Sequence, residues 1–461
     1  MSENEANPAP PTPTPVQHPL MDSVALAEAA EELLRSNDRG EYTVPAPDLY
    51  PHQWLWDSAF ISIGIAHYDI ERAKTELLHL LGGQWSNGMM PHMIFSTDPS
   101  FRAERNIWRS WINAHAPEDA STSGITQPPV LAEAVVRVGE HLTLSERRQW
   151  YKQVYPGLLA YHEWLYAERD PHQEGLVLQI HPWETGLDNT PPWMAEMREH
   201  LLPWWVRGLQ ITKLSGLVRF LRRDTRKISP AQRFTSTEVL ALFDTQKRLR
   251  RKGYDIHRIL NRSLFTIEDL SFNSMFIRAN EHLASIAKTL HQELPEELVA
   301  NMARTREALE LLWDDQSQQY YSRDFVTHRL LRTPSVATLM PLYAGSVTPD
   351  RAARLVKLIE NDHIFGTAYP TPTVPLSSDW FDANRYWQGP SWVNINWMII
   401  DGLRRYGYID HAEALRETTI EMVGHGGFYE YFNPLTGAPL GSEDFSWTAA
   451  LTLDLLHRPI K

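Results

Sequence analysis

The chain has 461 residues, 43% of them apolar, which is enough core material for one large domain or for two or three ordinary ones. It has no cysteine, so disulfides, thiolate metal sites and a cysteine nucleophile are excluded. A formal net charge of −13 argues against wholesale binding of nucleic acid or of an anionic membrane. No apolar run approaches the roughly 20 residues of a membrane span, and no secretory signal is visible, so we expect a cytoplasmic protein.

Residues 1 to about 20 read "MSENEANPAPPTPTPVQHPL", a proline-rich segment of low complexity. Such a composition buries too little apolar surface to order itself, which predicts a disordered leader. We expect the remainder, residues 21–461, to be the folded part of the chain.

Helical periodicity dominates the chain after the leader, because apolar residues recur three or four positions apart in several segments. The clearest sets are Leu26, Ala30 and Leu33; Phe276, Ala279, Leu283, Ile286 and Leu290; Ala352, Leu355, Val356 and Ile359; and Trp447, Leu451 and Leu455. Alternating strands are few, and Leu176–Ile180 is the best candidate. The pattern predicts a mostly α-helical fold.

The predicted loops carry most of the tryptophan, carboxylate and amide side chains. Loops of this kind, held by a rigid helical scaffold and converging on one end, would build a single pocket. An apolar aromatic wall with a few placed polar groups suits a carbohydrate ligand. The loops supply such a set: Trp54, Trp56 and Asp57; Trp85 and Asn87; Gln127; Trp183 and Trp193; Tyr386, Trp387, Gln388 and Trp392; Tyr429 and Tyr431.

One segment of this acidic chain is basic. Between Lys213 and Lys252 there are twelve Lys or Arg residues and three acids. The segment is typical of a solvated helical insertion, and it also fits a lid that offers positive charge to an anionic ligand.

Glycosidic cleavage usually requires two carboxyl groups, one of which donates a proton while the other activates water or attacks. The loop "HPWETGLDNTPPWM", whose glycine and prolines make a helix or central strand unfavourable, offers Asp188 as a catalytic carboxyl group. Glu184 in the same loop is the alternative. The stretch "YEYFNPLTG" offers Glu430 as the partner. Glu443 and Asp444 also compete for that role, but acids directly before a helix have a ready capping function, which favours Glu430.

Other chemistries have weaker support. His52 and His92 do not form a metal-binding spacing such as HExxH, and there is no GxSxG elbow, Walker loop or GxGxxG. We expect neither a metal nor another cofactor. A sugar isomerase or epimerase stays open because His52, His92 and His181 lie in the same loops, and a non-catalytic sugar-binding protein is the remaining alternative.

Six motifs in this order resemble those of the bacterial glucosylglycerate and mannosylglycerate hydrolases of glycoside hydrolase family 63: "LYPHQWLWDSAF", "QWSNGMMPH", "TSGITQPP", "GLDNTP", "YWQGPSW" and "EYFNPLTGAPLGS", the last followed by "SWTAA". The resemblance covers roughly residues 22 to 460. It implies an (α/α)6 toroid with a loop-built active site at one end and a helical cap, here a basic insertion at about residues 196–262. It also implies arginine contacts to the glycerate, although no particular arginine aligns.

The resemblance further implies an inverting, metal-free mechanism with Asp188 as general acid and Glu430 as general base. Contacts to the sugar or the glycerate are implied for Tyr50, Trp54, Asp57, Gln127, Trp183, Trp387 and Gln388, to which the loop composition adds Tyr386. The predicted substrate is a small carbohydrate, 2-O-α-glucosyl- or mannosyl-D-glycerate. An α-glucosidase acting on neutral glucosides or oligosaccharides is the alternative. The sequence leaves room for a homo-oligomer.

Overall fold

The computed structural model describes residues 20–197, 202–211, 224–261, 263 and 265–458. The predicted disordered leader therefore lies, apart from Leu20, outside the described residues. In the described part the chain is mostly helical, as the periodicity predicts, and its strands are two-residue pairs.

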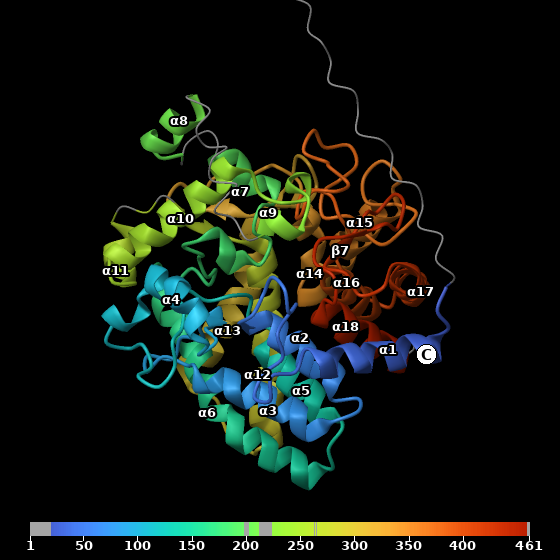
Figure 1. Ribbon diagram of the computed structural model, residues 1–461, viewed down its shortest axis with the longest axis horizontal. Coiled ribbons are helices and arrows are strands. Elements are labelled where there is room, and N and C mark those ends of the chain that lie inside the picture. The colour runs from blue at the N-terminus through green and yellow to red at the C-terminus, as the bar shows by residue number, and fades with distance from the viewer. Residues whose placement is uncertain (1–19, 198–201, 212–223, 262, 264, 459–461) are drawn as a thin grey trace, which may run out of the picture.

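Six of the described helices form a closed ring, because each packs on the next and the last packs on the first. In ring order they are α2 (Leu55–Ile65), α5 (Leu131–Glu140), α12 (Leu270–Thr289), α14 (Met340–Ala344), α16 (Val393–Arg405) and α18 (Ser446–His457). A helix outside the ring precedes each of them in the chain: α1 (Ser23–Ser36), α3 (Ile70–Gly82), α6 (Leu144–Arg169), α13 (Glu296–Ala308), α15 (Pro349–Glu360) and α17 (Ile409–Gly426). This alternation is an (α/α)6 toroid, which confirms the predicted fold class (Figure 1).

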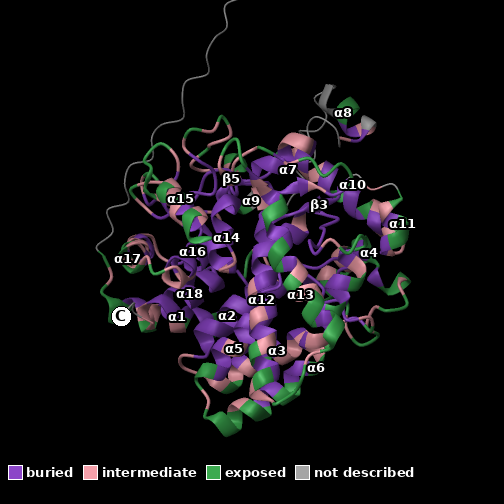
Figure 2. Cartoon of the chain, turned by 180° about the vertical axis from the view of Figure 1, so that it is seen from behind, coloured by how far each residue is buried: buried purple, intermediate pink, exposed green. Residues whose placement is uncertain are grey.

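Burial distinguishes the two layers of helices. Every residue of α2 is buried, and α18 is buried from Ser446 through Leu455. A helix that is apolar all round belongs in a core, whereas an outer helix needs only one apolar face. Figure 2 shows this contrast between α2 and the outer helix α6, whose solvent side is exposed. The predicted apolar faces of α1, α12, α15 and α18 are confirmed, with Leu290 and Ile359 only partly buried at the helix ends.

The loops ahead of the ring helices carry four short antiparallel pairs. These are β1 (Gln53–Trp54) with β2 (Met93–Ile94), β3 (Ile267–Glu268) with β6 (Arg323–Asp324), β4 (Trp313–Asp314) with β5 (Gln319–Tyr320), and β7 (Tyr431–Phe432) with β8 (Pro439–Leu440). The strand predicted at Leu176–Ile180 is wrong. Only Gln179 forms a bridge, to Ile267, and the side chain of Asn273 accepts the backbone N–H of Val177, so no ladder forms.

The predicted cap-like insertion lies partly outside the described residues. Its described part is helical and stands outside the twelve helices of the toroid, so its action as a cap stays a prediction. It contains α8 (Trp204–Ile211), α9 (Asp224–Lys227), α10 (Ser236–Arg251) and α11 (Ile256–Leu260), and it follows α7 (Pro191–Glu196). Figure 1 shows α7, α9 and α10 together beyond one end of the ring, with α4 (Arg102–Trp108) beneath α10.

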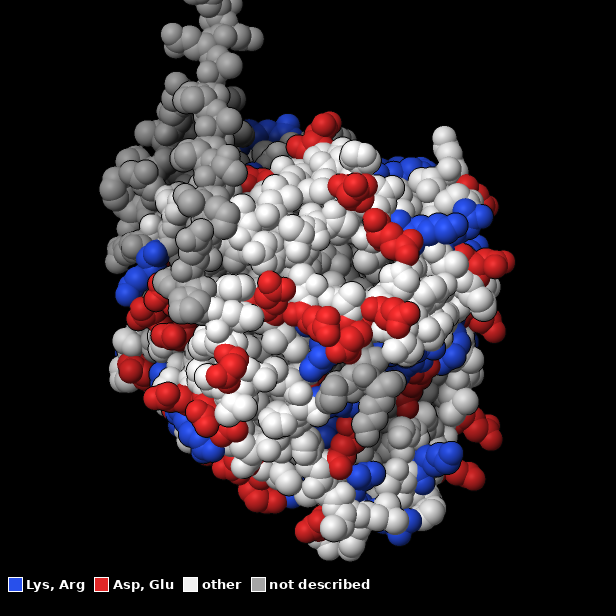
Figure 3. Space-filling view, turned by 90° about the vertical axis from the view of Figure 1, so that its right-hand side faces the viewer, with Lys and Arg blue, Asp and Glu red and all other residues white. Residues whose placement is uncertain are grey.

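No described helix is long and apolar enough to cross a membrane. On the face drawn in Figure 3, acidic and basic side chains are interspersed, and a band of acidic residues crosses the middle of the view.

The ring closes where α2 crosses α18, and glycine permits the close approach. A Cβ added to Gly64 would lie 2.3 Å from the Cα of Ala450. We expect Gly64→Ala to lower the free energy of unfolding by about 1–3 kcal/mol, because a backbone cannot yield as a flexible side chain can. Gly82→Ala is the matched control, since its Cβ would meet nothing within 4 Å and alanine favours a helix. Urea denaturation of both variants checks this, and equal stability would contradict it.

Candidate active site

Two adjoining cavities lie among the loops at the end of the ring where the insertion stands. The larger holds about 400 Å³ and the smaller about 60 Å³, and Tyr50, Trp54, Gln127, Asp188 and Tyr386 line both. Nine of the ten predicted site residues line one or both cavities: Tyr50, Trp54, Asp57, Gln127, Trp183, Asp188, Tyr386, Trp387 and Glu430. Gln388 does not, and its contact with a sugar stays a prediction. Trp56, Phe445 and Trp447 complete the aromatic wall of the smaller cavity.

The loop that carries Asp188 is shaped by a left-handed glycine. Gly186 has φ +75°, and a Cβ there would lie 2.6 Å from the ring of Trp56, so only glycine fits the turn. One side of Asp188 faces the cavity, and the hydroxyl of Tyr386 donates to its Oδ2 at 3.2 Å.

The protein around the Asp188 carboxyl raises its pKa to about 8, with burial as the main cause. The negative charge of Glu430 adds to the rise, while the bond from Tyr386 and the charge of Arg233 oppose it. Asp188 is therefore largely protonated at neutral pH and can donate a proton. The neighbouring Asp57, buried in the first turn of α2, also has its pKa raised well above the usual value, chiefly by burial.

Glu430 lies immediately before β7 and is held by the turn that follows β8. The backbone N–H of Ser442 donates to its Oε2 at 3.1 Å. A Cβ at Gly441, where φ is +77°, would lie 2.7 Å from the same oxygen. The hydroxyl of Tyr50 donates to Oε1 at 2.8 Å. Glu430 is thus fixed in the lining of the smaller cavity, which Asp188 also lines.

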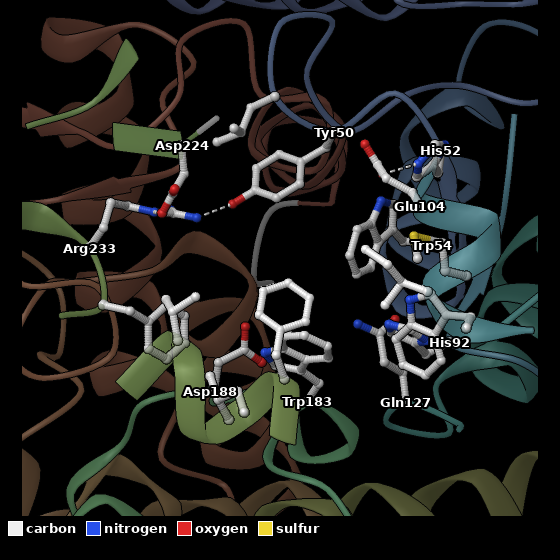
Figure 4. Close-up of a pocket in the computed structure, with 18 of the residues that line it drawn as sticks. Tyr50, His52, Trp54, His92, Glu104, Gln127, Trp183, Asp188, Asp224 and Arg233 are labelled. Carbon is white, nitrogen blue, oxygen red and sulfur yellow. Dashed lines mark hydrogen bonds and ion pairs between the residues drawn. The ribbon is translucent and has the colours of Figure 1, made fainter. Parts of the chain in front are cut away.

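The residue that sequence reasoning missed is Arg233, which comes from the basic insertion. Its Nη1 donates to both oxygens of Glu430, at 3.1 and 3.0 Å, and its Nη2 donates to Tyr50 Oη at 2.6 Å. Its Nε lies 3.7 Å from Asp224, and the guanidinium stacks 4.3 Å above the ring of Tyr386. Figure 4 shows Arg233 between Asp224 and Tyr50, above Asp188.

A local signal for Arg233 exists in the sequence. The arginine lies in the short gap between the turn Pro230–Gln232 and the capping box formed by Thr235 and Glu238. Arg233 directly follows this 3-10 turn, whereas the other arginines and lysines of the described insertion lie on α-helices or directly at their ends. A charged residue in a loop between two such signals is a candidate functional residue. The sequence does not show, however, that this loop reaches Glu430.

Glu184, the rival of Asp188 in the sequence, has a structural role. Arg169 donates two bonds to its carboxylate, at 2.7 and 3.0 Å, and both groups are buried. The backbone N–H groups of Thr126 and Ile180 complete the set at 3.2 and 2.7 Å. Glu184 therefore anchors the loop to its surroundings and has no oxygen left for a substrate.

The loop with Trp387 and Gln388 is tied to the residue after Asp188. The backbone N–H of Trp387 donates to Asn189 Oδ1 at 2.9 Å, and the amide of Gln388 donates to the Asn189 carbonyl at 2.7 Å. Trp392 stacks directly on Trp387, with ring centroids 3.7 Å apart. These contacts fix the cavity wall relative to Asp188.

The opposite wall of the larger cavity carries aromatic rings and histidines (Figure 4). Trp183 lies parallel to His92, with ring centroids 6.5 Å apart. Burial lowers the pKa of His92 well below the usual value, so His92 is neutral. His181, which lines neither cavity, is also neutral, because burial lowers its pKa to about 4. His52 accepts the N–H of Ser96 at 3.1 Å and contacts Glu104 through Nε2 at 2.8 Å. These rings are engaged with protein groups.

Among the described residues, one group could hold a metal ion: His172, Glu174 and His328. None of the three lines either cavity.

An (α/α)6 toroid with two differently tuned carboxyl groups in an aromatic pocket has the features of a glycoside hydrolase. The comparisons with known proteins agree. Residues 50–448 match the family model described as the mannosylglycerate hydrolase MGH1-like glycoside hydrolase domain, and the chain belongs to that family of enzymes.

The similar proteins span nearly the whole chain. A mannosylglycerate hydrolase of Thermus thermophilus is 38% identical over 92% of this chain and 99% of its own length. A glucosylglycerate hydrolase of Mycolicibacterium hassiacum is 34% identical over 95% and 99%. The crystal structure of a GH63 mannosylglycerate hydrolase from Thermus thermophilus, in complex with Tris and D-glycerate, superposes with a TM-score of 0.83, at 36% identity, over 94% of this chain and 100% of that one.

Proposed function

We propose that the enzyme is an inverting α-glycosidase that hydrolyses 2-O-α-glucosyl- or mannosyl-D-glycerate, with Asp188 as general acid and Glu430 as general base. The observation that carries the proposal is a pair of carboxyl groups, Asp188 and Glu430, which line the smaller cavity together with Asp57. One of them is kept protonated by burial and the other is paired with a guanidinium. Such opposed environments suit one proton donor and one proton acceptor.

In the proposed reaction the sugar occupies the smaller cavity. The oxygen of a water molecule attacks the anomeric carbon while its proton passes to Glu430. The bond from the anomeric carbon to the glycosidic oxygen breaks, and that oxygen takes the proton of Asp188. Attack from the face opposite the leaving group converts the α-glycoside into the β-sugar. Asp57, Trp56 and Gln127, which also line the smaller cavity, would contact the sugar.

The aglycone would lie in the larger cavity. Among the described residues that line it, Arg233 is the one Lys or Arg, which supports a carboxylate-bearing aglycone. The names of the relatives, mannosylglycerate and glucosylglycerate hydrolases, point to glycerate as that aglycone and to either sugar. A cap action of the basic insertion and a cytoplasmic location belong to the same proposal.

One observation favours the alternative of a neutral aglycone. Arg233 is already paired with Glu430 and lies close to Asp224, so its charge is compensated before any ligand enters. The isomerase alternative has less support, because the loop histidines are neutral or bonded to protein groups.

A panel of glucosylglycerate, mannosylglycerate, glucosylglycerol and maltose tests the substrate class. We expect the two glycerate glycosides to have by far the highest kcat/KM, because only they place a carboxylate near Arg233. Proton NMR during the first turnovers should show the β-anomer of the released sugar. Equal rates on glucosylglycerol would favour the neutral-aglycone enzyme, and release of the α-anomer would rule out inversion.

Substitution of the two carboxylates tests their roles. We expect Asp188→Asn and Glu430→Gln each to lower kcat on the glycerate glycoside by about 100- to 10,000-fold, the usual contribution of general acid or base catalysis. An α-glycosyl fluoride, whose leaving group needs little protonation, should separate them, because Asp188→Asn should spare its hydrolysis and Glu430→Gln should not. Glu443→Gln is the matched control, since Glu443 is exposed, lines neither cavity, and its carboxylate accepts the hydroxyl of Tyr429. Full activity in either test variant would refute the assigned role.

The pH dependence follows from the raised pKa of Asp188. A general acid works in its protonated form, so kcat/KM should fall as the pH rises through about 8. Tyr50 and Tyr386 do not interfere, because burial raises their pKa values well above 10. The residual activity of Asp188→Asn should lack this decline. A pH–rate profile of both proteins checks the prediction, and a decline of the same shape in the variant would contradict it.

A further inference from the structure

The carboxylate of Glu430 has no free acceptor position in this structure. Oε1 accepts from Tyr50 and Arg233, and Oε2 accepts from Arg233 and the N–H of Ser442. A carboxylate offers about four lone-pair directions, and four hydrogen bonds from three donor groups fill them. A general base must accept a proton from water, so one of these donors has to leave before Glu430 can act.

Two of the three donor groups are fixed by the scaffold. The N–H of Ser442 belongs to the backbone next to β8, where Gly441 lets the chain pass close to Glu430. Tyr50 is wedged between Trp54 and Phe445, each in edge-to-face contact at 5.9 Å between ring centroids. Both donors come from the loops of the toroid itself.

Arg233 is the donor that can exchange its partner. It belongs to the insertion, lies at the boundary of the larger cavity and already has an alternative acid nearby in Asp224. Its planar guanidinium binds one carboxylate as well as another, and it prefers bidentate partners. Figure 4 shows the guanidinium side by side with Tyr50, on the wall that faces the open pocket.

We propose that the carboxylate of the aglycone draws Arg233 away from Glu430 and so frees the general base to activate water. This inference rests on the proposed function. The carboxylate of the aglycone would then have two roles: the enzyme would recognise it, and its binding would activate the reaction. Neutral aglycones could enter the cavity, but Arg233 would stay on Glu430. Substrates with neutral aglycones would therefore differ from the glycerate glycosides mainly by a lower kcat, and less by a higher KM.

Hydrolysis of α-mannosyl or α-glucosyl fluoride tests the inference, because the small leaving group leaves the aglycone cavity empty. D-glycerate added to the reaction should occupy that cavity and raise kcat for fluoride release by about 10-fold or more, the factor expected when one hydrogen bond to a charged group is relieved. The stimulation should saturate. Glycerol, which has the same carbon skeleton and no charge, should not stimulate.

Variants at Arg233 give a readout that a merely structural role would not produce. Arg233→Gln should raise fluoride hydrolysis in the absence of D-glycerate and abolish the stimulation, while lowering kcat/KM for the glycerate glycoside. Arg233→Lys, which keeps the charge, should retain part of the stimulation. Arg251→Gln is the matched control, an exposed arginine in the last turn of α10, and it should behave as the unmodified enzyme.

The possible failures are distinguishable. If neither glycerate glycoside is hydrolysed, the proposed function fails and the inference fails with it. If a glycerate glycoside is hydrolysed but D-glycerate leaves fluoride release unchanged or slows it, the inference alone is overturned. A folded Arg233→Gln variant that loses fluoride hydrolysis together with glycoside hydrolysis would overturn it as well. The titration of the unmodified enzyme decides the matter even if that variant does not fold.

Discussion

The packing of α2 against α18 is the contact on which the site depends. It joins the beginning of the toroid to its end, and Asn37 secures the same seam by bonding to the hydroxyl of Ser446 and the carbonyl of Asp444. Tyr50 stands before α2 and Glu430 stands before α18, so their hydrogen bond exists only because the ring is closed. A substitution at Gly64 that disturbs this packing would therefore also disturb Glu430, although Gly64 does not contact it.

Local patterns in the sequence predicted much of this arrangement, because helices and turns are local structures. The apolar spacing around Phe276 and Leu283 predicted α12, and the glycine and prolines around Asp188 predicted a rigid loop. Contacts between distant segments were not predictable in this way. The extended run from Leu176 to Ile180 has strand composition, yet a side chain of α12 takes the place of a partner strand.

The roles of charged residues in the site were also only partly readable. Asp188 and Glu184 lie in the same loop, and the resemblance to a family, together with the second carboxylate, favoured Asp188. The structure adds the physical reason, because Arg169 and two backbone N–H groups use up the carboxylate of Glu184. Arg233 was not predicted from the sequence, because its role depends on its contact with Glu430 in space. The spacing of the two residues along the chain does not indicate that contact.

The alternation of outer and ring helices has an electrostatic consequence. Because the residues around the cavities come just before α2, α5, α16 and α18, the amino ends of these helices all face the pocket. The aligned peptide dipoles of a helix place a partial positive charge at its amino end. Four positive poles thus converge on the pocket of a protein whose net charge is −13. The toroid itself therefore places positive potential beside the three carboxyl groups of the smaller cavity, where burial has the opposite effect and raises the pKa values of Asp188 and Asp57.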